Sequence, residues 1–163
     1  MAVVNVNSDI LTNTYALSPI ANPTYLDIAD PWVKTATVSV AAADNIGSTY
    51  RLCQVGSNDL IISIQLIGDA LGGSAALSLG LYNPNGGAVV SVALFTTSTT
   101  FISAQFGTNV RFTAANPAAS AKKRVWELLA LSADPKLTYD LVLTTTAVAV
   151  SPGTIAAAYT FTR

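Results

Sequence analysis

Apolar and polar residues alternate with a period of two along much of the chain after residue 34. Between Thr35 and Val40, alanine or valine stands at each even position and threonine or serine at each odd one. Successive side chains of a β-strand point to opposite faces, so the alternation predicts strands with one apolar face. The predicted apolar faces are Ala36, Val38 and Val40; Leu60, Ile62, Ile64 and Leu66; Leu77, Leu79 and Leu81; Leu137, Tyr139, Leu141 and Leu143; and Ile155, Ala157, Tyr159 and Phe161.

Glycine-rich turns separate these runs. Asp69–Gly73 and Asn83–Gly87 each supply glycines for positive φ, and the second also contains Pro84. Short strands joined by such turns favour an all-β sandwich, barrel or jelly roll. We expect a core built on the most regular apolar positions: Leu60, Ile62, Ile64, Leu66, Leu79, Leu81, Leu141 and Leu143.

One segment has helical rather than strand spacing. Val125, Leu128 and Leu129 predict a helix, with Ser120 as a possible N-cap and Asp134-Pro135 as its end. Lys122, Lys123 and Arg124 would then lie where the helix dipole disfavours cations. Two interpretations stay open: a solvated loop that precedes the helix, or a basic contact patch that meets an acidic surface on a partner.

The first 33 residues differ from the rest of the chain. Pro19, Pro23 and Pro31 disfavour a helix and a central strand. The segment is too apolar for a disordered tail. We therefore expect an extended N-terminal arm over residues 1–33, lying on its own domain or on a neighbour, and a β-sandwich domain over residues 34–163. The predicted partner-binding side chains of the arm are Ile20, Tyr25, Leu26 and Trp32.

Composition adds a reason to expect partners. The 163 residues suit one domain, and 51% are apolar whereas only 10% are charged, against about 25% in a typical globular protein. A free monomer normally needs more surface charge to avoid apolar patches, so partners are expected to cover much of this surface. The net charge of −1 gives no attraction to nucleic acid or to an anionic membrane.

The chain is poor in catalytic side chains. It has no histidine, one glutamate and one cysteine, Cys53, which lies in a predicted strand and is expected to be buried. Asp27 and Asp30 are expected to be turn residues beside Pro31, although calcium held by Asp27, Asp30 or Asn85 with backbone carbonyls stays open. We expect no enzymatic activity, no cofactor and no transition metal. The sequence shows no secretion signal and no membrane span, which predicts synthesis in a cytoplasm.

Several short motifs carry a resemblance to a known family. They are Tyr50-Arg51-Leu52, Gly80-Leu81-Tyr82, the block from Val125 to Pro135, Tyr139-Asp140-Leu141 and Gly153-Thr154-Ile155. Together they resemble the head decoration, or capsid cement, proteins of tailed bacteriophages. The resemblance spans roughly residues 48–160. It implies a jelly-roll-like antiparallel β-sandwich with one short helix.

The resemblance also implies a role. Such a protein is a structural part of the virion that binds the outside of the major capsid protein shell and bridges neighbouring subunits. A homo-oligomer, dimer or trimer, is expected, located on the capsid exterior. Nucleic acid and membrane are not expected as partners.

Two alternatives remain from the residues. The first is another virion part, such as a tail or fibre module, although no repeat is visible. The second is a carbohydrate-binding β-sandwich that uses Trp32, Tyr82 or Tyr139 on an exposed face. Tyr139 and Tyr159 stand on predicted inward faces, which favours core packing for both.

Overall fold

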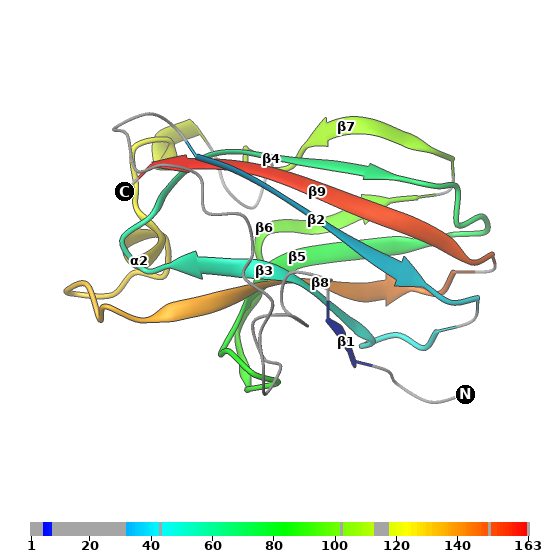
Figure 1. Ribbon diagram of the computed structural model, residues 1–163, viewed down its shortest axis with the longest axis horizontal. Coiled ribbons are helices and arrows are strands. Elements are labelled where there is room, and N and C mark those ends of the chain that lie inside the picture. The colour runs from blue at the N-terminus through cyan, green and yellow to red at the C-terminus, as the bar shows by residue number, and fades with distance from the viewer. Residues whose placement is uncertain are drawn as a thin grey trace.

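The computed structural model describes residues 5–7, 32–42, 44–101, 103–112, 118–149 and 151–162, and the fold is all-β. Two sheets pack face to face (Figure 1). Sheet I has the strand order β1-β3-β8-β5-β6, and sheet II has the order β2-β9-β4-β7. The strands are β1 (Asn5–Asn7), β2 (Trp32–Val40), β3 (Thr49–Gly56), β4 (Leu60–Gly68), β5 (Ala76–Tyr82), β6 (Val89–Thr100), β7 (Gln105–Asn109), β8 (Thr138–Ala147) and β9 (Gly153–Thr162).

The connections identify the sandwich as a jelly roll. From β2 onward each strand is followed by a strand of the opposite sheet, except that β5 and β6 form a hairpin within sheet I. This order is that of eight strands folded as two Greek keys. The short β1 adds to the edge of sheet I, parallel to β3. The predicted jelly-roll-like β-sandwich is confirmed.

The core lies between the two sheets and contains most of the predicted positions. On β2 and β9 the alternation is confirmed at every predicted inward residue, since Ala36, Val38, Val40, Ile155, Ala157, Tyr159 and Phe161 are all buried. Leu77, Leu79 and Leu81 of β5, and Tyr139, Leu141 and Leu143 of β8, are buried as well. Cys53 is fully buried and free, as expected.

The predicted face of β4 is wrong at its start. The pairing of β4 with β9 shifts between Ile61 and Ser63. The extra residue of this bulge reverses the alternation, so Ile61 is fully buried whereas Ile62 is 42% exposed and Leu60 is half-buried. Leu137 was also predicted to face inward, but it is exposed because it lies in the loop before β8 begins.

The helix is much shorter than the apolar spacing predicts. It is a single turn, α2 (Val125–Leu128), and its N-cap is Arg124 rather than Ser120, which ends the separate 3₁₀ turn η1 (Ala118–Ser120). Lys122 and Lys123 therefore precede the helix, which removes the conflict with its dipole. None of the helices in the described part of the chain is long and apolar enough to cross a membrane.

Sheet I is buried on its outer face as well. Arg51, Val142 and Gly80 form one row across β3, β8 and β5. They alternate with the core residues, so they point away from sheet II, and Arg51 is only 3% and Val142 0% exposed. A Cβ atom built on Gly80 would lie 2.0 Å from the carbonyl oxygen of Ser91, so the backbone of β6 passes directly over Gly80.

Candidate interaction surfaces

The exposed charges of the described residues gather at one end of the sandwich. Around α2, Lys122, Lys123 and Lys136 are exposed and Arg124, Glu127 and Asp134 are half-buried, four cations against two carboxylates, whereas Asp69 is exposed at the other end of β4. Five further charged side chains are buried: Asp44, Arg51, Asp59, Arg111 and Asp140. These six residues give this end a net charge of +2, and the half-buried Lys34 of β2, beside them, adds one more positive charge.

The β3–β4 turn holds α2 in place. The backbone N–H groups of Val125 and Trp126 donate to the carbonyl oxygens of Asp59 (3.0 Å) and Ser57 (2.9 Å). The Val125 side chain is fully buried and belongs to the core. This anchoring fixes the basic residues that precede the helix relative to the sandwich.

Of the predicted basic patch, Lys122 and Lys123 are exposed and Arg124 is partly used by the fold. The Arg124 guanidinium donates from Nη1 to the carbonyl oxygen of Asn58 at 2.6 Å. Its backbone N–H donates to Glu127 Oε2 at 2.7 Å. Two free-standing lysines beside a fixed arginine form a surface suited to an acidic partner.

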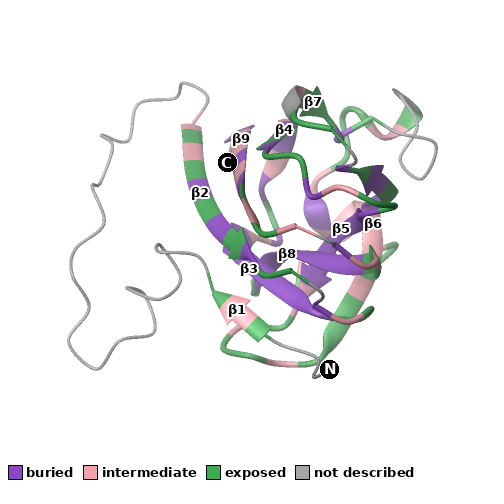
Figure 2. Cartoon of the chain, turned by 90° about the vertical axis from the view of Figure 1, so that its right-hand side faces the viewer, coloured by how far each residue is buried: buried purple, intermediate pink, exposed green. Residues whose placement is uncertain are grey.

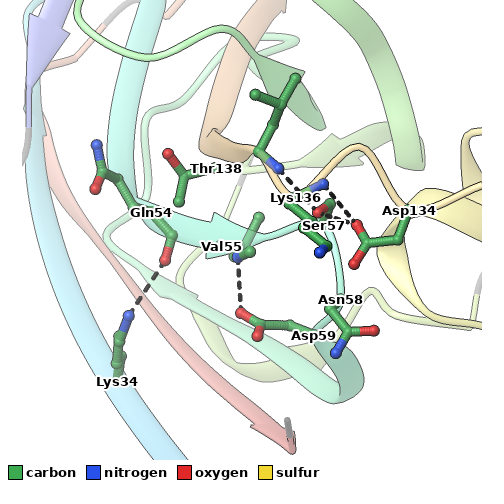
Figure 3. A pocket seen from close by; sticks show the side chains of 11 residues that line it. Lys34, Gln54, Val55, Ser57, Asn58, Asp59, Asp134, Lys136 and Thr138 are labelled. Atoms are coloured by element: carbon green, nitrogen blue, oxygen red, sulfur yellow. Dashed lines mark hydrogen bonds between the residues drawn. The ribbon is translucent and has the colours of Figure 1, made fainter.

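A cavity of about 510 Å³ opens beside this end, between the β3–β4 turn, the start of β8 and Lys34 of β2 (Figure 3). Both carboxylates that line it are engaged by the fold. Asp59 Oδ2 accepts from the backbone N–H of Gly56 at 2.7 Å. Asp134 Oδ1 accepts from the Ser57 hydroxyl and from the backbone N–H of Lys136, and these bonds hold the pKa of the Asp134 carboxyl below its ordinary value.

The amine of Lys34 in the same cavity is also used. Its Nζ donates to the carbonyl oxygen of Gln54 at 3.3 Å and lies 5.1 Å from the ring centroid of Phe161. The one hydroxyl beside a carboxylate here, Ser57 on Asp134, also accepts from the backbone N–H of Leu137 at 3.1 Å, so both groups are used by the loop that they hold together. Among the residues that the structure describes, no three His, Cys, Asp or Glu side chains are placed to hold a metal ion.

A buried ion pair fastens the β5–β6 hairpin onto sheet I. Arg51 Nη1 lies 2.8 Å from Asp140 Oδ2. The same guanidinium donates to the carbonyl oxygens of Asn83 and Gly87, both at 3.0 Å, at the two ends of the hairpin turn. The sequence analysis missed this pair, although a charged residue at an otherwise apolar strand position, Tyr50-Arg51-Leu52, was a signal for it.

The hairpin also carries the clearest apolar patch. Val89, Val90 and Val92 of β6 are 53%, 38% and 44% exposed. They lie on the strand that passes over Gly80, and the turn before it is tied to Arg51 through the carbonyl oxygens of Asn83 and Gly87. Such a patch is typical of a contact with another protein.

The outer face of sheet II is open and uncharged. Its rows across β2, β9 and β4 are Val33–Thr160–Ser63, Thr35–Ala158–Gln65 and Thr37–Ala156–Ile67. The β2 members of these rows are exposed, and Ile67 is 43% exposed. Small, neutral side chains on a regular sheet give a flat surface that loses little hydration when it is covered.

The predicted arm residues are placed only in part. Trp32 begins β2, is half-buried, and its ring centroid lies 6.1 Å from that of Phe161. Ile20, Tyr25 and Leu26 lie outside the described residues, as do Asp27 and Asp30. Asn85 lies in the β5–β6 turn with φ 54°.

The aromatic side chains proposed for sugar binding are engaged elsewhere. Tyr139 is buried, and the Tyr82 hydroxyl lies 2.9 Å from Thr144 Oγ1. Trp32 packs on Phe161. Of the aromatic side chains that the structure describes, Phe112 is the most exposed, at 42%, and the Arg111 guanidinium lies 4.7 Å from its ring centroid.

Two solved structures contain chains with this fold. A chain in the capsid of Ralstonia phage GP4 aligns with a TM-score of 0.62 at 13% identity, covering 98% of this chain and 98% of that one. A chain in the cyanophage Pam1 capsid asymmetric unit aligns with a TM-score of 0.54 at 12% identity, covering 88% and 91%. No protein-family model and no curated protein matches the sequence. At these identities the likeness shows a shared fold.

Proposed function

We propose that this protein is a structural component of a tailed-phage capsid, a decoration or cement protein that binds the outside of the major capsid protein shell. The observation that carries the proposal is the fold shared over nearly the full length of both chains with a capsid chain of Ralstonia phage GP4. The motifs that resemble decoration proteins support the same role. In this role the protein bridges neighbouring shell subunits and is not an enzyme.

The distribution of charge supports a function based on covered surface. The outer face of sheet II presents Thr, Ala and Ile, and the hairpin of sheet I presents Val89, Val90 and Val92. Covering apolar surface contributes about 25 cal/mol per Å². A sandwich with such faces would stabilise a shell by covering apolar surface on two neighbouring shell subunits at once.

The N-terminal arm is proposed as the first contact. Ile20, Tyr25, Leu26 and Trp32 are large apolar side chains, each worth roughly 1.5–3 kcal/mol when fully buried. The prolines among them reduce the entropy lost when an extended path is adopted. We infer that these residues contact a neighbouring shell subunit.

The basic patch is proposed as the second contact. Lys122 and Lys123 are exposed, and Arg124 is held by Asn58 beside them. Attraction between this end and an acidic surface of the shell speeds encounter and fixes orientation more than it adds affinity.

The test is binding of the purified protein to shells assembled from the major capsid protein of the same virus. Co-sedimentation should show saturable binding, and decorated shells should unfold at a higher temperature than bare ones. Deleting residues 1–30, which also removes the short edge strand β1 from sheet I, should leave a folded body that binds at least tenfold more weakly. Unchanged affinity after this deletion would remove the arm from the proposal, and no binding by the intact protein would overturn the decoration role.

A charge-matched pair of variants tests the basic patch. Lys122→Gln with Lys123→Gln removes two positive charges at the α2 end. Ala70→Glu with Ser74→Glu makes the same change in net charge at exposed positions of the opposite end. The first variant should slow association severalfold at low salt, and the second should not. Equal effects would show that net charge, rather than this patch, governs binding.

A further inference from the structure

Strand β6 exposes consecutive apolar side chains where a regular strand would bury every second one. It has 12 residues against 7 in β5, and the pairing of the two strands shifts three times. The shift next to the hairpin turn inserts one extra residue at Val90. Because such a bulge redirects side chains, Val89 and Val90 are both exposed, together with Val92. These three residues are called the valine patch.

The hairpin brings no charge of its own to this surface. The sequence contains no charged residue between Asp69 and Arg111, a stretch that includes all of β5 and β6. A carboxylate or ammonium of a partner placed over the valine patch would lose hydration without meeting an opposite charge. The complementary surface is therefore apolar and uncharged, unlike the acidic surface that Lys122 and Lys123 would attract.

The bulges also determine how a partner can use β6. This strand stands last in the strand order of sheet I in the described part of the chain. Repeated register shifts break the even spacing of N–H and C=O groups that a further strand would need for pairing. A contact here therefore depends on the side chains of the valine patch, which suit an apolar groove rather than the edge of another sheet.

Arg51 fixes the turn that leads into the valine patch. Its Nη1 donates to the carbonyl oxygen of Asn83 and its Nη2 to that of Gly87, both at 3.0 Å. Nη1 also lies 2.8 Å from Asp140 Oδ2, whereas Nε is buried without a hydrogen-bond partner in the described part. A buried charge that is incompletely satisfied stabilises a fold less than apolar packing does. A planar fork that reaches both ends of a turn is instead suited to holding the turn in one orientation.

We propose that the valine patch enters an apolar, uncharged groove on a subunit of the shell, and that Arg51 is the residue that positions it. The inference rests on the proposed capsid role and adds the chemistry of one contact. The hairpin turn projects from sheet I on the side away from sheet II, where a partner can reach it (Figure 1). Because Arg51 already holds the turn in the free protein, docking loses less conformational entropy than it would with a loose turn.

Two double variants of β6 test the groove. Val89→Asp with Val92→Asp places two carboxylates in the valine patch. Thr97→Asp with Ser98→Asp makes the same change in net charge at exposed positions farther along the same strand. In co-sedimentation with shells of the major capsid protein, the first variant should bind at least tenfold more weakly and the second like the wild type. The loss should persist at high salt, because it arises from dehydration of the carboxylates rather than from long-range repulsion.

Arg51→Lys tests the positioning role. Lysine keeps a positive charge beside Asp140 but cannot reach both turn carbonyls from one rigid plane. The backbone N–H groups of Asn83 and Gly87 are bonded within the turn, so their hydrogen exchange should become faster in this variant, while exchange in β9 stays unchanged. Shell binding should weaken severalfold. Arg51→Met with Asp140→Leu replaces the ion pair by apolar side chains, so it should keep the fold and still weaken binding.

Each outcome separates the hairpin contact from the capsid role. Wild-type affinity of the Val89→Asp, Val92→Asp variant would overturn the groove and leave the capsid role standing, whereas no binding by the wild type would overturn both. If this variant instead dissociates a wild-type oligomer in sedimentation equilibrium and binds shells normally, the patch meets a second copy and the inference is wrong. Unchanged turn exchange and unchanged affinity of Arg51→Lys would overturn the positioning role.

Discussion

Sheet I and sheet II share one core but differ in what covers their other face. The outer row of sheet I, Arg51, Val142 and Gly80, is buried under the β5–β6 hairpin. The corresponding rows of sheet II carry small neutral side chains with no described strand above them. Figure 2 shows the contrast, with β2 striped by alternating burial and β8 buried along much of its length. Sheet I is therefore an internal layer, whereas sheet II is a surface.

The largest expected effect is loss of the ion pair beneath the hairpin. Asp140→Ala leaves the Arg51 guanidinium buried without its carboxylate, which should lower the free energy of unfolding by about 3–5 kcal/mol. Urea unfolding followed by circular dichroism measures the change. The matched substitution on the open sheet, Gln65→Ala, should cost no more than about 0.5 kcal/mol. A loss below 1 kcal/mol for Asp140→Ala would mean that the outer row of sheet I is hydrated like that of sheet II.

The next effect tests the bulge in β4. Ile61→Ala removes a fully buried side chain and should cost about 2–5 kcal/mol, whereas Ile62→Ala, next to it, removes an exposed one and should cost less than about 1 kcal/mol. The two variants differ only in position, so each controls the other in the same unfolding experiment. The reverse order would restore an unbulged β4 and the strict alternation that its sequence suggests.

A smaller effect compares the two outer faces directly. Gly80→Ala places a methyl group 2.0 Å from the backbone oxygen of Ser91, an atom that cannot rotate away. The hairpin must shift, at a cost of about 1–3 kcal/mol. Ala158→Val adds bulk to the open face of sheet II and should change stability by no more than about 0.5 kcal/mol. If both variants unfold at the same urea concentration, the hairpin is not packed on β5.

The smallest effect concerns the core that both sheets share. Burial raises the pKa of the Cys53 thiol from 9.0 to about 12. Above pH 9 the unfolded chain loses this proton first, so stability falls as pH rises between 9 and 12. At pH 10 the loss from this group should be about 1–1.5 kcal/mol. Cys53→Ala should reduce the difference between urea midpoints at pH 8 and pH 10, and an unchanged difference would assign it to other groups, such as Tyr50, whose pKa burial also raises.

The accuracy of the sequence predictions follows the same division between the sheets. Strands β2 and β9 are buried on one face only, so the alternation of apolar and polar residues in their sequences correctly predicts every inward residue. β8 buries Asp140 and Val142 on its outer side, and its sequence therefore loses the period of two. The partner of Arg51 stands 89 residues away in sequence, and no local pattern connects the two. The local sequence does not indicate the bulge at Ile61 either, since four apolar residues at alternate positions fit a strand without a bulge.

The candidate surfaces were predictable to different degrees. Lys122, Lys123 and Arg124 are consecutive, so the sequence alone shows the basic patch; the structure adds that Arg124 is tied to Asn58. The apolar patch on β6 appears only when the crossing over Gly80 is known. The place of β2 at the end of the strand order in sheet II depends on how the described strands pair, which no single segment encodes.

The position of β9 between β2 and β4 has a consequence for how the chain folds during its synthesis. Each β2 residue finds its partner on β9 more than 100 residues later in the chain. While the polypeptide grows, β2 and β4 leave the ribosome long before the strand that joins them. Contacts between residues so far apart in sequence form slowly, because the entropy cost of closing the long loop comes before any contact energy is gained. We expect sheet II to assemble only after β9 has emerged, and chaperones to meet β2 during that interval.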